Sequence, residues 1–371
     1  MFAVRPHDDE IVHHDGDFFS VSLAITGSAI TLLATPVKTK QTVPEAHSEL
    51  LHYTTVAGLL GILDSQSLRA THAAYLNDST EIQLFFRERL GKVLESGIRA
   101  ELDQNPQLRV LPELARSPEE ADAVVVRYAA EMAEAIRTTS QRFNQPHFVC
   151  FSAPASPRIA RDGLLSLWRG YGKDGGYALV FDTAALENCL RLEATTFWYQ
   201  HMQWGNVHYH QEDDDLAHAD PEILESEELL RSAIRAYIRE PSPAALEPTF
   251  EPVATLSCLF KHWGFHEERE VRIVAIPPTE ELIREGREGG EARPVRELKT
   301  FTRSGTPIPY LDLFAREPGQ PTSANVGLPI KRVLVGPHPQ SELRRSAVEE
   351  MLRVRGISAQ VEVSRIPFIG G

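Results

Sequence analysis

Two carboxylates and a guanidinium are spaced two residues apart at Glu268, Glu270 and Arg272. On a β-strand this spacing places the three side chains on one face, with about 6.6 Å between the two acidic positions. Val271 and Ile273 then face the core, so we expect the acidic face to border a cleft or solvent. Paired carboxylates can orient a ribose hydroxyl and stabilise an oxocarbenium-like state. Alternatively, the three residues form a solvated, salt-bridged strand face.

A histidine followed by hydroxyl side chains occurs at His52, Tyr53 and Thr54, in a segment predicted to be a short buried strand. A neutral imidazole supplies one hydrogen-bond donor and one acceptor, which suits the hydroxyl groups of a sugar. The three residues are therefore candidates for binding a small ligand. Alternatively, His52 is a core histidine whose ring nitrogens bond to backbone groups.

A third candidate group combines Ser152, at the end of a predicted strand, with Trp168 and Tyr171 on a short predicted helix. An aromatic face can stack on a planar heterocycle, and a serine hydroxyl can hold a carboxamide. Because the two aromatic residues are three positions apart on one helix, the alternative is that both belong to the core.

Asn77 and Asp78 are candidates for positioning a ribose or an acceptor. Asp78 and Glu81 also have the spacing of a capping box, so the alternative is a helix N-terminus. Histidines at positions 208 and 210, and others near the start of the chain, lack the spacing of a known zinc motif, and we expect no metal site.

The elements that must position these residues alternate between strands and helices. Apolar patterning predicts strands at 50–54, 148–152, 177–181, 197–210 and 268–276, and further strands at 299–302, 308–313, 330–335 and 360–364. Helices are predicted mainly within 83–143, and at 164–171, 220–239, 250–263 and 341–354. Thr54 or Thr55 is also predicted to cap a helix that carries Leu59, Leu60, Ile62 and Leu63 on its inner face. This order predicts an α+β fold in which helices are inserted around a core sheet.

The chain is predicted to contain one main domain. Residues 46–371 form this domain, with helical insertions at 83–143 and 220–262, and residues 1–45 form an N-terminal extension. Alternation of apolar and polar residues within the extension predicts a β-hairpin. Residues 318–325 resemble a linker but are too few to separate two domains.

Composition limits the classes of partner. The chain has 371 residues, of which 52 are acidic and 38 basic, giving a formal net charge of −14. This sign disfavours extended duplex nucleic acid, whose binding depends on Lys and Arg. Three widely separated cysteines fit neither a disulfide framework nor a CxxC site, so we expect a reducing cytoplasm. The apolar stretch 18–34 is shorter than the roughly 20 residues of a spanning helix and is rich in Ser and Thr, so no membrane association is expected.

Taken in order, these motifs resemble the bacterial domain-of-unknown-function family numbered 2971, which is itself similar to a divergent ADP-ribosyltransferase fold. The resemblance covers residues 51–368. The residues that carry it are Leu76-Asn77-Asp78 with Glu81, Leu167-Trp168-Arg169-Gly170-Tyr171, residues 176–182, Val207-His208-Tyr209, Lys261 with Phe265, Glu268, Glu270 and Arg272, Ile308-Pro309-Tyr310, Val335-Gly336-Pro337 and Ser364-Arg365-Ile366-Pro367.

The resemblance implies an ADP-ribosyltransferase-like core of antiparallel or mixed sheets and a role for each motif. His52, with Thr54 beside it, would hold the adenosine-side ribose of NAD. Ser152 and Tyr171 would contact nicotinamide. Glu270 would bind the nicotinamide ribose, and Glu268 would help to activate the acceptor.

The function expected from this resemblance is NAD-dependent ADP-ribosyl transfer, in which NAD is a substrate and the nicotinamide–ribose bond is cleaved. An NAD glycohydrolase is an alternative, with water as the nucleophile. Another alternative is a non-catalytic sensor that binds a nucleotide or RNA in a bacterial defence or toxin system. The acceptor in the expected transfer is a protein, a nucleic acid or a small molecule.

Overall fold

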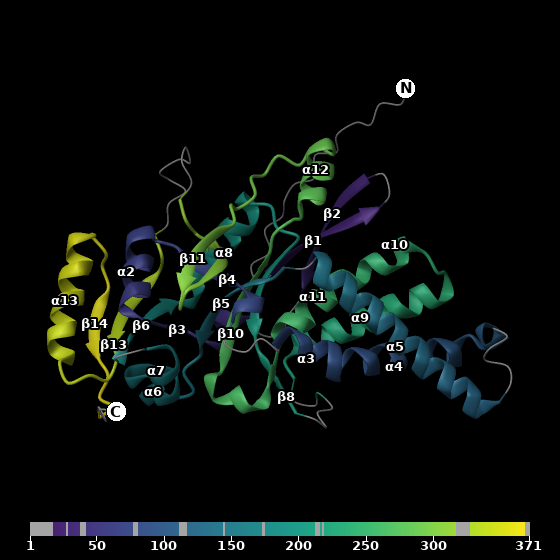
Figure 1. The fold of residues 1–371 in the computed structure, drawn as a ribbon, viewed down its shortest axis with the longest axis horizontal. Helices are drawn as coiled ribbons and strands as arrows, with labels where there is room; N and C mark the ends of the chain where they lie inside the picture. The colour runs from purple at the N-terminus through teal and green to yellow at the C-terminus, as the bar shows by residue number, and fades with distance from the viewer. Residues whose placement is uncertain are drawn as a thin grey trace.

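The computed structural model describes residues 18–26, 29–37, 42–76, 81–110, 117–143, 145–172, 175–211, 216, 219–316 and 327–367. Two segments named above, residues 77–78 and the linker-like 318–325, lie outside the described residues. The described chain combines a large mixed sheet with helices on its faces, which confirms the predicted α+β class (Figure 1).

The central sheet has ten strands within the described part of the chain. Its main path runs β11-β12-β4-β5-β3-β6-β13-β14, and β10 and β7 extend it from β5. Neighbouring strands are antiparallel except β13 and β14, which are parallel. The strands are β3 (Glu49–Thr54), β4 (Leu68–His72), β5 (His147–Ser152), β6 (Tyr177–Asp182), β7 (His201–Asn206), β10 (Glu270–Ile276), β11 (Lys299–Arg303), β12 (Thr306–Leu313), β13 (Ile330–Val335) and β14 (Gln360–Val363).

Strand β5 is the branch point of this sheet. One of its edges pairs with β10 along the whole strand, from Ser152 opposite Glu270 to His147 opposite Ala275. The other edge pairs with β4 only at its beginning and with β3 only at Ser152, which lies opposite Leu51. Because β3 and β4 diverge between these points, they leave the middle of this edge of β5 open to a cleft.

Helices cover both faces of the sheet. On one face α1 (Val43–Ala46), α2 (Val56–Ser65), α8 (Thr183–Thr196) and α13 (Ser341–Val354) contribute to a core with Val271 and Ile273. On the other face α3 (Glu81–Glu88), α4 (Leu90–Gln104), α5 (Pro118–Phe143), α9 (Pro221–Arg239) and α11 (Phe250–Leu259) pack over Phe148 and Val274. Figure 1 shows α4, α5 and α9 extending to one side of the sheet.

A third, smaller core holds the helix that carries Tyr171. Helix α7 (Leu165–Tyr171), which follows α6 (Pro157–Asp162), packs Leu167 and Trp168 against β3, β6 and β13. The remaining elements are β8 (His208–His210), which is parallel to β9 (Phe260–His262), the helices α10 (Pro243–Leu246) and α12 (Glu280–Glu288), the 3-10 turns η1 (Ala73–Tyr75), η2 (Pro106–Val110), η4 (Glu247–Thr249) and η5 (Trp263–Glu268), and the antiparallel strands β1 (Phe18–Thr26) and β2 (Ala29–Val37).

Three predicted boundaries are wrong. The strand predicted at 197–210 begins only at His201 and is interrupted at Val207, which separates β7 from β8. The helix predicted at 250–263 ends at Leu259, because the next residues pair with β8 as strand β9. The strand predicted to begin at Glu268 begins at Glu270, because Glu268 ends the turn η5 and Arg269 has a left-handed backbone with φ of 44°. Helix α8 was not predicted, although Asp182 marks its N-terminus by accepting a hydrogen bond from the Ala185 amide.

Candidate functional site

The divergence of β3 and β4 from β5 opens a cleft of about 990 Å³. Its walls come from the end of β3, the first turns of α2, strand β4, the middle of β5, the end of α7 and the β11–β12 hairpin. Small-molecule sites commonly have volumes of about 300–1,000 Å³. The cleft therefore has room for a ligand as large as a dinucleotide.

His52 lies at the point where β3 leaves β5. Its Nδ1–H donates to the carbonyl of Cys150 at 2.9 Å, on the part of the β5 edge that β3 no longer pairs. This bond leaves Nε2 as the acceptor of a neutral ring. Burial lowers the pKa of His52, and the bond to Cys150 only partly offsets this effect, so the ring is neutral at pH 7. His52 lines the cleft as an uncharged hydrogen-bonding group.

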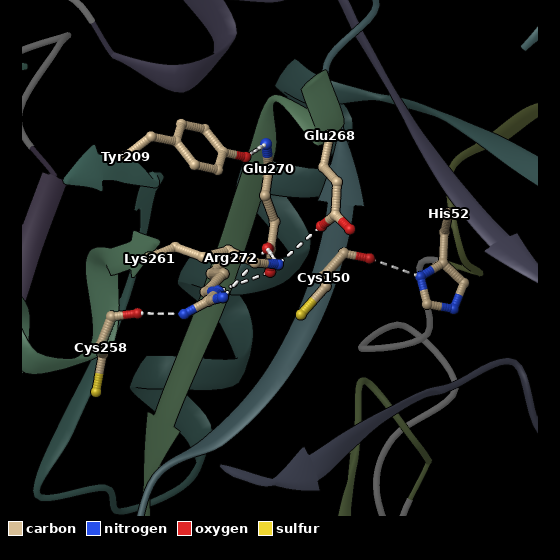
Figure 2. A network of polar contacts seen from close by, with 8 residues as sticks. All are labelled: His52, Cys150, Tyr209, Cys258, Lys261, Glu268, Glu270 and Arg272. Carbon is tan, nitrogen blue, oxygen red and sulfur yellow. Dashed lines mark hydrogen bonds and ion pairs between the residues drawn. The ribbon is translucent and has the colours of Figure 1, made fainter. Parts of the chain in front are cut away.

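Both glutamates bind the same lysine. Lys261 Nζ donates to Glu268 at 2.7 Å and to Glu270 at 2.6 Å. Arg272 also binds Glu270, from Nε at 2.6 Å and from Nη2 at 3.1 Å, and donates from Nη1 to the Cys258 carbonyl at 2.8 Å. Figure 2 shows these groups on one side of Cys150 and His52 on the other.

The pKa values of the two carboxylates are shifted in opposite directions because the carboxylates have different partners. Burial favours the neutral form of Glu270, but Arg272 and Lys261 outweigh it and hold the pKa of Glu270 below its usual range. Burial raises the pKa of Glu268, and Lys261 alone does not reverse this shift. Glu270 is therefore the more firmly ionised of the pair, and Glu268 is the carboxylate with the higher affinity for a proton.

The predicted single acidic strand face is wrong in two respects. Glu268 precedes the strand, and the left-handed Arg269 turns the backbone between the two glutamates. Arg272 does not face the cleft or solvent, because it is fully buried beneath the helical layer and its guanidinium lies over the Phe148 ring. Glu270 is 5% exposed and lines the cleft.

Tyr171 reaches the cleft at the end of α7. It is 37% exposed and lines the cleft with Glu270 and Lys261. Trp168, one turn earlier, is buried instead, donates from Nε1 to the Asp162 carbonyl at 3.0 Å and packs edge-on against Tyr53 at 4.8 Å. The Tyr53 hydroxyl accepts from the Leu164 amide at 2.9 Å. Tyr53 and Trp168 therefore hold α7 on the sheet and so position Tyr171.

The other predicted site residues have separate places. Thr54 lines the cleft, and its hydroxyl lies against Gly58 at the start of α2. Ser152 is buried where β3, β5 and β10 meet, opposite both Leu51 and Glu270, and does not line the cleft. Asn77 and Asp78 lie outside the described residues.

Sequence reasoning missed the group that joins the two acids. Lys261 was placed within a predicted helix and was not assigned a role in the site. Tyr209 was also missed, although its hydroxyl accepts from the Glu270 amide at 2.7 Å and supports the first residue of β10. Spacing along the chain does not reveal these contacts, because β8, β9 and β10 come together only in the folded protein.

The described residues contain no group of three or more His, Cys, Asp and Glu side chains arranged to hold a metal ion. Nor does any helix in the described part of the chain combine the length and the apolar character needed to cross a membrane.

Comparison with known proteins gives one match. Residues 167–273 match the family model described as Protein of unknown function (DUF2971). This segment includes Tyr171, Tyr209, Lys261, Glu268 and Glu270, so the match covers the acid-bearing wall of the cleft but not the strand that carries His52. The search of curated proteins and the search of solved structures gave no match.

Proposed function

We propose that this protein cleaves the nicotinamide–ribose bond of NAD and transfers ADP-ribose to an acceptor. The observation that carries the proposal is that His52, Tyr171 and Glu270, which come from three distant segments, line one cleft of about 990 Å³. The cleft thus brings together a neutral imidazole for sugar hydroxyls, an exposed aromatic ring for a planar base and a carboxylate that Lys261 and Arg272 keep ionised.

The proposed reaction breaks the bond between the ribose C1′ and the nicotinamide nitrogen, and the bonding electron pair leaves with nicotinamide. Glu270 stabilises the resulting oxocarbenium-like ribose by its negative charge and by accepting a hydrogen bond from a ribose hydroxyl. Glu268 accepts the proton of the attacking nucleophile, which forms the new bond to C1′. Water in this role would make the enzyme a glycohydrolase.

The test is nicotinamide release from NAD, measured by chromatography with and without cell extract as a source of acceptor. We expect Glu270→Gln to abolish release, because it removes the charge that stabilises the transition state. Glu270→Asp keeps the charge among Lys261 and Arg272 but retracts the carboxylate, and we expect it to lower kcat by at least about 100-fold. Glu267→Gln is the matched control, since this exposed glutamate on η5 accepts from the Ser166 hydroxyl at 3.4 Å and does not line the cleft. Normal release by folded Glu270→Gln would refute the mechanism.

A second candidate function is a sensor that binds a nucleotide without cleaving it. It is favoured by the ion pairs of Glu270, whose carboxylate is already bound by Lys261 and Arg272 as in a structural network. Calorimetry with NAD separates the two functions, because binding without nicotinamide release in the presence of cell extract would support the sensor.

A further inference from the structure

A guanidinium that has no carboxylate partner among the described residues faces the cleft from β4. Arg69 lies over the Phe301 ring at 5.3 Å and over the Tyr310 ring at 5.0 Å, both from the β11–β12 hairpin. Its Nη2 also lies against α2, 3.6 Å from the position that a Cβ on Gly61 would take. Packing between a helix and two rings restricts the rotamers of this side chain, so it loses less entropy on binding a ligand.

The acid nearest to Arg69 in the sheet is already engaged. Asp312 is directly opposite Arg69 in the β4–β12 register. Its carboxylate, however, binds Lys299 Nζ at 3.1 Å and the Ser67 hydroxyl at 3.2 Å. Within the described chain, no carboxylate lies in ion-pair contact with Arg69. The guanidinium is therefore left with its charge uncompensated at the cleft wall.

Among the described residues, the lining of the cleft carries an excess of positive charge. The lining residues charged at neutral pH, with histidine taken as neutral, are Arg69, Lys261, Arg303 and Glu270. Lys261 is neutralised by Glu270 and Glu268, whereas Arg303 donates to the Tyr75 carbonyl, which carries no charge. The uncompensated charge is thus on the arginines beside the β11–β12 hairpin, away from the acids.

We propose that Arg69 is the subsite for the diphosphate of a nucleoside diphosphate ester. This inference rests on the proposed function and assigns the end of the ligand that does not react. A guanidinium presents parallel N–H donors that match phosphate oxygens, and charge-assisted bonds of this kind are the stronger ones. The diphosphate would then lie beside the β11–β12 hairpin, with the reacting ribose towards Glu270.

Isothermal calorimetry with ADP and adenosine tests this assignment without requiring bond cleavage. We expect the wild-type protein to bind ADP more tightly than adenosine, with an affinity that falls as salt is raised. Arg69→Gln should weaken ADP binding by about 10-fold or more, the value of a charge-assisted hydrogen bond, and leave adenosine binding unchanged. Phe301→Leu keeps the charge but removes one ring, and we expect a smaller loss of ADP affinity.

Arg158→Gln is the matched control, because this exposed arginine on α6 changes the net charge equally and does not line the cleft. Unchanged ADP affinity in Arg69→Gln, or an equal loss for ADP and adenosine, would overturn the assignment. If the wild-type protein binds ADP through Arg69 but releases no nicotinamide from NAD, only the proposed function is refuted. If the wild-type protein releases nicotinamide and Arg69→Gln leaves ADP binding unchanged, only the assignment of the subsite is refuted.

Discussion

Lys261 sets the balance between the two acids at the scale of single residues. It is almost fully buried and lies within hydrogen-bond distance of both Glu268 and Glu270. Together with Arg272 it keeps Glu270 ionised at a buried position where desolvation alone would favour the neutral acid. Since the folded pKa of Glu270 is depressed, the stability that this group contributes is present above its unfolded value of about 4.3 and is lost as pH falls through the folded pKa.

Replacing Lys261 tests this balance. In Lys261→Met the pKa values of Glu268 and Glu270 should both rise, because each carboxylate loses its ammonium partner. If ionised Glu270 is required, the acid limb of the pH profile of nicotinamide release moves to higher pH. Lys331→Met is the control, since Lys331 forms only a long ion pair, 3.8 Å, with Glu49. An unshifted profile in active Lys261→Met would show that Lys261 does not tune the acids.

Helix α7 depends on a tight turn at the scale of elements. Gly163 separates α6 from α7 with φ of 74°, in the left-handed region that favours glycine. A Cβ at this position would lie 2.5 Å from Trp168 Nε1, the atom that donates to the Asp162 carbonyl. The glycine therefore lets Trp168 close the turn that directs Tyr171 towards the cleft.

Substitution of this glycine should affect both stability and the cleft. We expect Gly163→Ala to destabilise the protein by about 1–3 kcal/mol, because it adds a steric clash to backbone strain. The expected displacement of α7 would also raise KM for NAD. Urea unfolding and nicotinamide release measure the two effects. Gly290→Ala is the control: Gly290 has φ of 97° but no heavy atom within 4 Å of its Cβ position, so it reports the backbone strain alone. Equal losses in the two variants would contradict the role of Trp168.

A buried ion pair links distant parts of the chain at the scale of the whole molecule. Arg296 binds Glu193 of α8 through Nε and Nη2, each at 2.6 Å. Glu193 also accepts from the Tyr199 hydroxyl at 2.7 Å and from the Phe314 amide at 3.0 Å. The Glu193 carboxylate thus joins four parts of the chain: α8, the segment before β7, the segment before β11 and the end of β12. Strand β12 forms part of the hairpin beside Arg69.

Removal of this carboxylate should destabilise the whole fold. We expect Glu193→Ala to lower the free energy of unfolding by about 3–5 kcal/mol, because Arg296 would remain buried without a counterion. Glu187→Ala on the same helix is the control; its ion pair with the exposed Arg191 is 3.9 Å long and should contribute no more than about 1 kcal/mol. Urea unfolding compares the two variants, and equal effects would show that the buried network is not needed for stability.

The local sequence determined most of the elements. Strand β3 and helix α2, with Thr55 as its cap, follow from apolar periodicity and capping chemistry, as do α5 after Ser117 and α13. These patterns depend on residues only a few positions apart, so the elements can be predicted from the sequence without knowledge of the tertiary structure. The Glu268–Arg272 motif was identified in the same way, but its geometry was predicted wrongly, because a left-handed Arg269 does not alter the alternation of residue types.

Only the tertiary structure decided which groups share the cleft. The branching of the sheet at β5 brings His52, Tyr171 and Glu270 together, whereas the helical layer on the far face buries Arg272. Arg69 acquires its place at the cleft wall from the ring of Phe301, which is more than two hundred residues away along the chain. Lys261 acquires its role from the folding of β9 beside β10. The energy of pairing between strands that are distant in sequence depends on the packing of the whole sheet, so it cannot be predicted from the spacing of residues along the chain.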